Sequence, residues 1–401
     1  MKNIFIKITK LFSARWRFLP PNEKETVFYD VEKSIDLKKY FNKNSYQFLY
    51  TRYEEINFFI ILISVFDKLK NKSNSFSFNY FKNFIKYSKA KYVISFNTLD
   101  LNFWYLKKSL KKTQFILIQN NNSITSPREQ KIIKDKLLLK NLNKKGYLDY
   151  IFMFGEKMKK HFAKFIKCKS PIVTGSYLNN LVINKNFRLG KEIIYISQYR
   201  DFGSFKIADK LNNKNLMMNI LYNNDKLILN FLSNYCKKNN FNLFILTKQS
   251  ANINIKNSKI KEKKYFEKIL KSSKFKFLTP GNLKSTYNIL NKYRNFVTVN
   301  SNLGFEALSR GNRVAFMSIR YKASGIYKNE GFGDVYHNLK KGPFWTDDIK
   351  KKELERVLNY SIKTSNKKWK IIKEKFVDPI IKYDFDNSIL IKKFKKIGIN
   401  L

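Results

Sequence analysis

The sequence is poor in cysteine, histidine, proline and glycine, which excludes several classes of protein. Of its 401 residues, only two are cysteine, two are histidine, seven are proline and 13 are glycine. These counts exclude a collagen-like chain and a disulfide scaffold. Cys168 and Cys236 form no CxxC pair, which is typical of a reduced protein with ordinary thiols. Two histidines leave little material for a zinc site or a Ser-His-Asp triad, so we predict neither a metal nor a cofactor.

Long hydrophobic runs are also absent. The run Phe58–Phe66 has only about half of the roughly 20 residues that a membrane-spanning helix needs. We therefore expect it to form a buried helix, and we predict no transmembrane segment. The basic N-terminal segment, 1–20, lacks the continuous apolar core and cleavage site of a secretory signal. We expect a helix packed on the first domain or a frayed end there, with an amphipathic helix on a membrane surface as the alternative.

Acidic residues are scarce relative to basic ones. The chain has 30 Asp and Glu against 80 Lys and Arg, a net charge of +50, and only 11 of the basic residues are arginine. Codon bias with solvated lysines explains this most simply, and attraction to nucleic acid or anionic lipid is the alternative. No zinc-finger spacing, RNP-type motif or basic region before a heptad accompanies the charge, so nucleic acid ranks low as a partner. We expect a cytoplasmic protein, with peripheral contact with anionic lipid at the inner face of the membrane.

Apolar residues are abundant enough to build large cores. Hydrophobic residues make up 43% of the chain and aromatic residues 16%. The length exceeds what one core usually supports, and short β-branched runs alternate with helical stretches throughout. We therefore predict an α/β protein with two doubly wound, Rossmann-like domains facing a cleft. The predicted parts are a basic segment at 1–20, a first domain at 21–185, a linker at 184–191, a second domain at 191–349 and a helical tail at 350–401.

The same patterning predicts eleven strands. They are Thr26–Val31, Gln47–Tyr50, Tyr92–Phe96, Phe115–Gln119, Tyr150–Phe154, Pro171–Thr174, Glu192–Ser197, Leu243–Thr247, Phe275–Leu278, Asn295–Val299 and Val314–Met317. The helical stretches between them include Glu54–Lys70, Phe76–Ser88, Asn102–Leu110, Ser126–Asn141, Asp225–Lys238, Tyr265–Lys271, Leu283–Asn291 and Leu303–Ser309.

The region 294–342 concentrates two scarce residue types. Six of the 13 glycines and four of the 11 arginines lie in it. Because the chain otherwise uses lysine for positive charge, these arginines indicate a use for the planar guanidinium fork. Chance clustering with ordinary ion pairs is the alternative. This region is nevertheless the best candidate for a binding site.

Its centre, TVNSNLGFEALSRG at 298–311, predicts a strand followed by a capped helix. Ser301 and Asn302 are good N-cap residues, and Gly304 would let a ligand approach the first turn, where N–H groups favour a phosphate. Glu306 would then accept hydrogen bonds from the ribose of a nucleotide, and Gly311 would end the helix. A simple capped helix with no ligand is the alternative.

The segment SNLGFEALSRGNRVAFMS, followed by GPFWT at 342–346, resembles the bacterial surface carbohydrate biosynthesis protein family. Further matches in the expected order are FYD at 28–30, FGEKMKKHF at 154–162, VTGS at 173–176 and YISQYR at 195–200. The strand–NSxLGxEA–helix–RG–strand arrangement also resembles the nucleotide-binding motif of GT-B glycosyltransferases. It is similar as well to that of the related UDP-GlcNAc 2-epimerases and CDP-glycerol glycerophosphotransferases. The resemblance implies a GT-B-type fold with an acceptor domain first and a nucleotide-sugar domain second.

The resemblance also implies a donor site at the strand ends of the second domain. Ser301 and Asn302 would meet the donor diphosphate, Glu306 would meet the ribose, and Lys248 would neutralise the leaving group. The residues implied in donor binding are Ser197, Gln198, Arg200, Lys248, Ser301, Asn302, Gly304 and Glu306.

One turn departs from the family pattern. After the strand Phe115–Gln119 the family has a Gln-Asn-Gly type turn, whereas this chain has Asn120, Asn121 and Asn122. Because asparagine tolerates the left-handed conformation, we expect it to take the place of glycine in this loop.

Two residues are candidates for acid–base catalysis. Asp30, at the end of the first strand, would serve as the base for an acceptor hydroxyl, and His337, in a glycine-rich stretch, would contact a substrate. A helix-capping aspartate and an exposed loop histidine are the alternatives. Phe344 and Trp345 would form a wall for a sugar ring or a base, with ordinary packing as the alternative.

These features predict a glycosyltransferase of surface polysaccharide biosynthesis. It would transfer a sugar from a nucleotide-activated donor to a glycan or lipid-linked acceptor, with cations and helix N–H groups stabilising the departing diphosphate. A polyol-phosphate transferase or a sugar-nucleotide epimerase on the same fold is one alternative. A basic nucleic-acid-binding protein is another.

Overall fold

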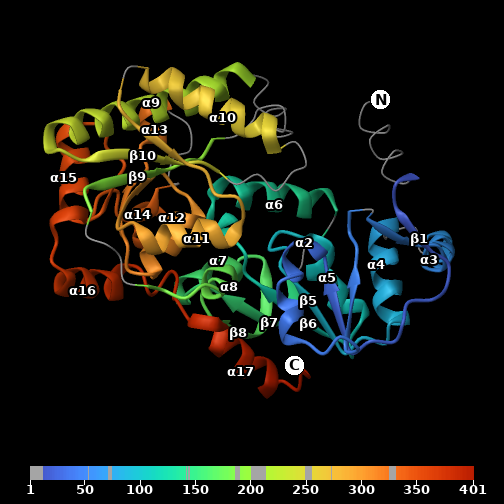
Figure 1. Ribbon diagram of the computed structural model, residues 1–401. Helices are drawn as coiled ribbons and strands as arrows, with labels where there is room; N and C mark the ends of the chain where they lie inside the picture. Colours follow the sequence, from blue (N-terminus) through green and yellow to red (C-terminus); the bar gives the residue numbers. More distant parts are fainter. Residues whose placement is uncertain are drawn as a thin grey trace. The chain divides into compact units, whose positions relative to one another are not determined.

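The chain divides into two compact units, shown in Figure 1. Unit 1 comprises Met1–Ile124, Glu129–Tyr177 and Asn387–Leu401, and unit 2 comprises Thr125–Arg128 and Leu178–Asp386. The computed structural model describes residues 12–52, 54–70, 75–140, 142, 145–185, 190–199, 214–248, 255–271, 273–324 and 331–401. The change of unit after Tyr177 precedes the predicted linker, whose residues 186–189 lie outside the described ranges. Most of the predicted basic segment, residues 1–11, lies outside them as well.

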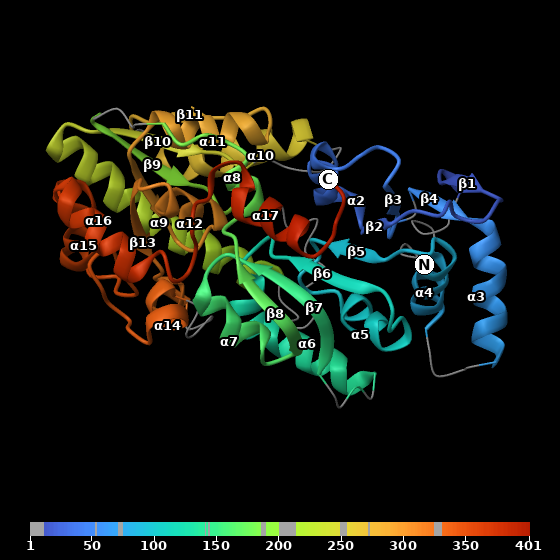
Figure 2. The same ribbon diagram turned by 90° about the horizontal axis from the view of Figure 1, so that it is seen from below.

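Unit 1 contains a six-stranded parallel sheet with the order β3-β2-β5-β6-β7-β8 (Figure 2). The chain passes from β2 outward to β3 and returns to β5 on the other side of β2. Strand order therefore reverses between β2 and β5, and all the carboxyl ends lie at one edge. The strands are β2 (Thr26–Tyr29), β3 (Tyr46–Leu49), β5 (Tyr92–Ser95), β6 (Gln114–Ile118), β7 (Gly146–Met153) and β8 (Ile166–Val173).

Unit 1 also has a two-stranded parallel pair, β1 (Arg15–Arg17) with β4 (Glu55–Asn57). Its helices are α2 (Val31–Ser34), α3 (Phe58–Lys70), α4 (Phe76–Tyr87), α5 (Leu101–Ser109), most of α6 (Pro127–Leu139), α7 (Lys159–Phe162) and α17 (Ser388–Lys396), with short 3₁₀ turns at Leu37–Tyr40, Ser123–Thr125 and Glu156–Met158.

Helix α3 is not the buried helix that its apolar sequence predicts. Only Ile60 and Ser64 are buried in it, whereas Phe66 is 62% exposed and Leu69 is 67% exposed. The physical reason is its position, because α3 packs along α4 and β1 and leaves its other face in solvent.

The C-terminal helix α17 completes the core of unit 1. The Phe394 ring lies 6.0 Å from Phe41 and 5.3 Å from Phe152, measured between ring centroids. The hydroxyl of Tyr92, on β5, donates to the carbonyl of Ile397 over 2.8 Å. The chain therefore ends in the unit in which it begins.

Unit 2 contains a second six-stranded parallel sheet, with the order β11-β10-β9-β12-β13-β14. Here strand order reverses between β9 and β12. The strands are β9 (Glu192–Ile196), β10 (Asn242–Leu246), β11 (Lys276–Leu278), β12 (Asn295–Thr298), β13 (Arg313–Met317) and β14 (Trp345–Thr346). The helices are α8 (Tyr177–Asn180), α9 (Lys214–Asn239), α10 (Ile255–Leu270), α11 (Leu283–Lys292), α12 (Asn302–Ser309), α13 (Arg320–Ser324), α14 (Phe332–His337), α15 (Lys351–Lys363) and α16 (Asn366–Phe376), with a 3₁₀ turn at Phe385–Asn387.

The unit 2 sheet is packed on both faces, as a doubly wound sheet requires. Ile193 and Tyr195 point to the face covered by α9, α10 and α15. On the other face, the Phe316 ring lies 4.9 Å from Phe305 of α12 and 4.7 Å from Phe332 of α14. Alternate side chains of each strand thus enter two separate cores.

The two parallel sheets confirm the predicted α/β class with two Rossmann-like domains. All eleven predicted strands are present, while the short strands β1, β4 and β14 are additional. Within the described part of the chain, no helix combines the length and the apolar character that crossing a bilayer requires.

Candidate functional site

The carboxyl edge of the unit 2 sheet gathers most of the residues implied in donor binding. Parallel strands place their carboxyl ends together, and loops diverge where strand order reverses, so ligands bind there in this type of sheet. Arg200 lies outside the described residues. We use the name unit 2 edge for the residues that follow four of its strands, namely Ser197, Gln198, Lys248, Ser301 and Arg320.

Glu262 joins the first two loops of the unit 2 edge. Its Oε1 accepts a hydrogen bond from the Ser197 hydroxyl over 2.5 Å and from the backbone N–H of Lys248 over 3.0 Å. The Ser197 hydroxyl also accepts from the N–H of Tyr199 over 3.1 Å. Glu262 is 2% exposed. The Ser197 side chain thus organises the loop backbone in this structure, and the Lys248 side chain is exposed.

Arg320 joins two further loops. Its Nη2 donates to Oε1 of Gln198, and β12 lies between the strands that these two residues follow. The bond therefore spans the end of β12, where α12 begins. Arg320 also acts on the buried carboxyl group of Asp225. Burial raises the pKa of Asp225, and the positive charge of Arg320 opposes that rise. The same carboxyl group accepts hydrogen bonds from Tyr195 and Tyr265 over 2.8 Å each. A guanidinium group is thus fixed at the point where strand order reverses.

The first turn of α12 begins at the unit 2 edge. Ser301 occupies the N-cap position with φ −83° and ψ 139°, but its side chain makes no capping hydrogen bond. Its backbone N–H donates to Oγ1 of Thr298 over 3.2 Å. Asn302, the first helical residue, is exposed. The N-cap position of Ser301 is thus as the sequence predicts, while its role in binding a phosphate stays a prediction.

Gly304 and Glu306 face the protein interior. A Cβ at Gly304 would come within 2.6 Å of Cγ2 of Thr298, so glycine here lets α12 pack closely on β12. Oε2 of Glu306 accepts a hydrogen bond from the Tyr287 hydroxyl over 3.0 Å, and Glu306 is 8% exposed. Gly311, which follows the helix, has φ +94° and ends it as predicted.

Three of the four clustered arginines are structural. Arg310 donates to the carbonyls of Asn179, Val182 and Ile183 and to Oδ1 of Asn291, over 2.6–3.2 Å. Arg313 is 2% exposed and lies 4.6 Å from the Trp369 ring centroid, and it shares Oδ1 of Asn366 with Arg294. These three guanidinium groups therefore bind groups of the protein itself. Of the four clustered arginines, only Arg320 belongs to the unit 2 edge.

Phe344 and Trp345 are core residues and not a substrate wall, which corrects the prediction. They are 0% and 1% exposed, and both pack on Phe332 with ring centroids 5.2 Å apart. The His337 ring stacks on Trp345 at 5.3 Å, and its Nε2 donates to the carbonyl of Phe376 over 3.1 Å. His337 is therefore bound into the same aromatic cluster and not placed as an exposed loop histidine.

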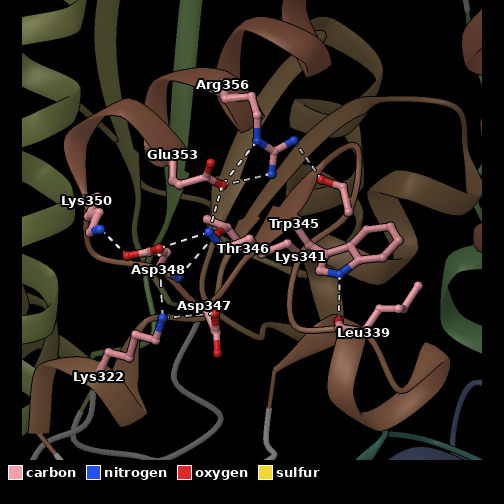
Figure 3. A network of polar contacts seen from close by, with 11 residues as sticks. Lys322, Leu339, Lys341, Trp345, Thr346, Asp347, Asp348, Lys350, Glu353 and Arg356 are labelled. Carbon is pink, nitrogen blue, oxygen red and sulfur yellow. Dashed lines mark hydrogen bonds and ion pairs between the residues drawn. The ribbon is translucent and has the colours of Figure 1, made fainter.

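A polar network continues from this cluster (Figure 3). Nε1 of Trp345 donates to the carbonyl of Leu339 over 3.0 Å. Lys341 pairs with Asp348 at 3.0 Å and with Glu353 at 3.7 Å, and Arg356 pairs with Glu353 at 3.1 Å. The GPFWT motif thus anchors β14 and its loops. Its aromatic residues serve to pack the protein core.

Asp30 lies where strand order reverses in unit 1. It directly follows β2 and has φ +74°, a left-handed value that is costly for a residue other than glycine. Its carboxylate accepts a hydrogen bond from Nη2 of Arg52 over 3.0 Å, and its carbonyl accepts from the Ser34 hydroxyl over 2.6 Å. Its N–H donates to the carbonyl of Leu49 over 3.1 Å. These bonds hold Asp30 in its left-handed conformation at the carboxyl end of β2.

The asparagine loop after β6 folds differently from the prediction. None of Asn120, Asn121 and Asn122 has a positive φ. Instead the side chain of Gln119 holds the loop, donating to the carbonyl of Asn121 over 3.0 Å and accepting from the N–H of Phe154 over 2.9 Å.

Sequence reasoning missed two residues that organise these sites, Arg52 and Glu262. The burial of Glu262 could have been predicted from the sequence, because it shares one face of α10 with Phe266, Ile269 and Leu270 at helical spacing. An acidic residue on an apolar face must find a buried donor. Arg52 gave no such signal. Among the described residues, no group of three or more His, Cys, Asp or Glu side chains lies close enough together to hold a metal.

Comparison with protein families identifies a match over most of the chain. The family model described as "putative O-antigen biosynthesis protein" matches residues 130–398, more than half of the chain. No curated protein matches the sequence.

Several solved structures are similar at low identity. UDP-GlcNAc 2-epimerase from Methanocaldococcus jannaschii, in complex with UDP-GlcNAc and UDP, is 13% identical with a TM-score of 0.48, covering 93% of this chain and 99% of that one. S. aureus MnaA with UDP is 11% identical with a TM-score of 0.49, covering 93% and 96%. The wall teichoic acid polymerase TagF is 12% identical with a TM-score of 0.46, covering 94% and 90%.

Proposed function

Since the chain belongs to this family of O-antigen biosynthesis proteins, we propose that it is a glycosyltransferase that uses a nucleotide-activated donor. The acceptor is a glycan or a lipid-linked sugar of a surface polysaccharide. Unit 2 binds the donor at the unit 2 edge, and unit 1 binds the acceptor near Asp30.

One observation carries the donor assignment, namely the bond between Arg320 and Gln198. It holds a guanidinium group beside the start of α12, at the reversal of strand order where nucleotides bind in such sheets. The helix start adds N–H groups and a positive dipole end, both of which favour a phosphate. Lys248, exposed after β10, supplies a second positive charge.

The proposed reaction needs two kinds of help from the protein. An acceptor hydroxyl attacks the anomeric carbon of the donor, and the bond from that carbon to the diphosphate oxygen breaks with its electron pair. The diphosphate thereby gains negative charge, which Arg320, Lys248 and the helix N–H groups stabilise. A base must take the hydroxyl proton, and Asp30, which follows β2 in unit 1, is the residue that we propose for this role.

Glu306 is proposed to contact the donor ribose, as the family motif implies. Its carboxylate has four lone-pair positions, so it can accept from Tyr287 and from a ribose hydroxyl at once. Ser301 and Asn302 contact the diphosphate.

A thermal-shift panel of UDP-, GDP-, CDP- and CMP-linked sugars, with CDP-glycerol, tests the proposal. A ligand at 100 times its Kd stabilises the native state by roughly 2.7 kcal/mol. We expect one nucleotide-sugar to raise Tm, and we expect Arg320→Gln to weaken that affinity about tenfold or more because a charged hydrogen bond is lost.

Arg356→Gln is the matched control. Arg356 lies in the same unit and pairs with Glu353, but it lies outside the unit 2 edge, so its replacement should leave affinity unchanged. Stabilisation by no ligand of the panel would contradict the proposal. Stabilisation by CDP-glycerol alone would favour a polyol-phosphate transferase.

A further inference from the structure

One face of α3 holds five large apolar side chains in solvent. Phe66 is 62% exposed and Leu69 is 67% exposed, and the three others are 39–45% exposed. We call this set the α3 stripe, and its members are Phe58, Leu62, Val65, Phe66 and Leu69. Scattered exposed apolar residues are ordinary, but a contiguous set is typical of an interaction surface.

The stripe follows the helical repeat. Its members occupy positions i, i+4, i+7, i+8 and i+11, which at 100° per residue fall within an arc of about 100°. Ile60 and Ser64 lie on the opposite side and are buried. That side is bound to α4, where Nδ2 of Asn83 donates to the Ser64 hydroxyl over 3.2 Å. The helix is therefore firmly packed by one face while the stripe stays outside.

Aromatic residues near β1 extend the stripe. The rings of Trp16 and Phe18 lie 6.5 Å and 5.8 Å from the Phe58 ring, measured between centroids. Phe18 is 68% exposed and Leu19 is 79% exposed. Figures 1 and 2 both show β1 and α3 together at one end of unit 1. Tryptophan is suited to the boundary between lipid and water because its ring is apolar and its N–H is polar.

Basic residues beside the α3 stripe favour an anionic partner. Lys68 and Lys70 flank its C-terminal end, roughly 80° to one side of Phe58 and 120° to the other at the helical repeat. Asp67, the one acidic residue within α3, pairs with Lys82 at 2.6 Å.

Arg15 and Arg17, on β1, add positive charge beside the Phe58 end of the stripe, and together with Lys68 and Lys70 they form what we call its basic rim. Arg15 and Arg17 both pair with Glu55, at 2.6 Å and 3.3 Å, so two positive charges share one negative charge. An apolar strip with a basic rim fits a surface that is apolar inside and anionic outside. The net charge of +50 attracts the chain to the same surface over a longer range.

We propose that the α3 stripe, with Trp16 and Phe18, inserts into the interface of an anionic lipid bilayer. The helix lies parallel to the membrane plane, with its apolar side chains below the headgroups and the lysines among them. A 13-residue helix of this kind binds without crossing the bilayer. The inference is independent of the proposed catalytic function, because α3 and β1 belong to unit 1 and carry none of its catalytic residues.

Binding to vesicles measures the contribution of the stripe. The full chain is mixed with vesicles of phosphatidylcholine alone or with phosphatidylglycerol, and the bound fraction is found by sedimentation. We expect binding to the anionic vesicles, and the double variant Phe66→Gln, Leu69→Gln should weaken it about tenfold or more. The matched control is Leu138→Gln, Leu139→Gln, which removes leucines that are 69% and 85% exposed on α6, and it should bind as the unaltered chain does.

The tryptophans provide a second, site-specific measurement. Trp104, Trp345 and Trp369 are at most 4% exposed, whereas Trp16 is 38% exposed. Brominated lipids quench tryptophans that enter the bilayer, so they should quench the bound chain, and Trp16→Phe should abolish the quenching while binding persists. Circular dichroism of each variant checks that it is folded.

Three outcomes would overturn the proposal. The α3 double variant could bind as tightly as the unaltered chain, or the bound chain could show no quenching and be released fully by salt, which would mean charge attraction alone. The chain could also form a dimer without lipid that the double variant dissociates, which would assign the stripe to a second copy.

Discussion

The hydroxyl of Tyr287, on α11, donates a hydrogen bond to the carboxylate of Glu306, on α12, over 3.0 Å. Tyr287 is 2% exposed and Glu306 is 8% exposed, and burial together with the charge of Glu306 raises the pKa of the tyrosine well above its usual value. A residue implied in ribose binding thus also ties two helices together. The two roles can be separated because only one of them involves the donor.

We expect Glu306→Gln to weaken nucleotide-sugar affinity about tenfold, since hydrogen bonds to a charged group contribute about 1.5–3 kcal/mol and those to a neutral group about 1. The same variant should lose about 1 kcal/mol of unfolding free energy through its weakened bond with Tyr287. Isothermal titration and urea unfolding on one preparation measure both effects.

Tyr287→Phe is the matched control for that experiment. It removes the donor hydroxyl but keeps the carboxylate, so it should reduce stability by about 1–3 kcal/mol and leave nucleotide affinity unchanged. Equal affinity of Glu306→Gln and the unaltered chain would remove Glu306 from the donor site and leave it a structural residue.

Asp30→Asn should abolish most transfer while preserving the fold. Asparagine tolerates the left-handed φ of +74°, and the lost ion pair with half-exposed Arg52 contributes at most about 1 kcal/mol. Loss of a positioned base lowers turnover by about 10²–10⁴-fold. Release of nucleoside diphosphate in the presence of acceptor is the measurement.

Arg52→Gln distinguishes a base from a structural partner. It breaks the same ion pair but leaves the Asp30 carboxylate in place. We expect its turnover to fall much less than that of Asp30→Asn. If the two variants lose activity equally, Asp30 acts as a positioning residue for Arg52 and not as the base.

The strands of both sheets could be predicted because parallel strands buried on both faces are short runs of apolar, β-branched residues. β2 and β5, for example, are buried at every position. The exposure of α3 could not be predicted, because its composition is that of a core helix. In the fold, α4 and β1 cover only one face of it, and the other face lies in solvent. β14 has two residues, too few for any pattern.

The candidate site was predictable only in part. Gly311 has a positive φ that a helix end requires, so its role follows from its residue type. Trp345 and Arg310 were misleading, because large aromatics and arginines serve equally in ligand sites and in cores. Which of these uses applies depends on burial, and burial depends on elements far away in the sequence.

Trp345→Ala should unfold more easily and not bind less. The side chain is 1% exposed and packs on Phe332, His337 and Phe376, so its removal should cost about 3–5 kcal/mol. Urea unfolding measures the loss, and nucleotide affinity is measured below the shifted transition. Trp345→Phe keeps most of the ring and should lose less. Unchanged stability with weaker binding would restore the role as a substrate wall.

His161 is a buried base whose charged form the fold disfavours. Burial, followed by the charges of Lys160 and Lys164, lowers its pKa from 6.5 to about 4. Lys164 donates to Oε1 of Gln130 over 2.9 Å, and Nε2 of Gln130 donates to Nδ1 of His161 over 3.3 Å. The neutral imidazole can accept this last bond, whereas a protonated ring would present a donor to a donor.

Unfolding free energy should therefore fall as the pH drops from 6.5 toward 4. In this range the unfolded chain binds a proton at His161 and the native chain does not, so stability rises with pH and falls on acidification. The loss reaches about 3 kcal/mol at pH 4, the difference between pKa values of 6.5 and about 4. The measurement is urea unfolding of the unaltered chain and of His161→Gln at several pH values. Their difference isolates this group because His337 and the carboxylates are common to both. Parallel curves across the range would show that His161 is protonated in the native state.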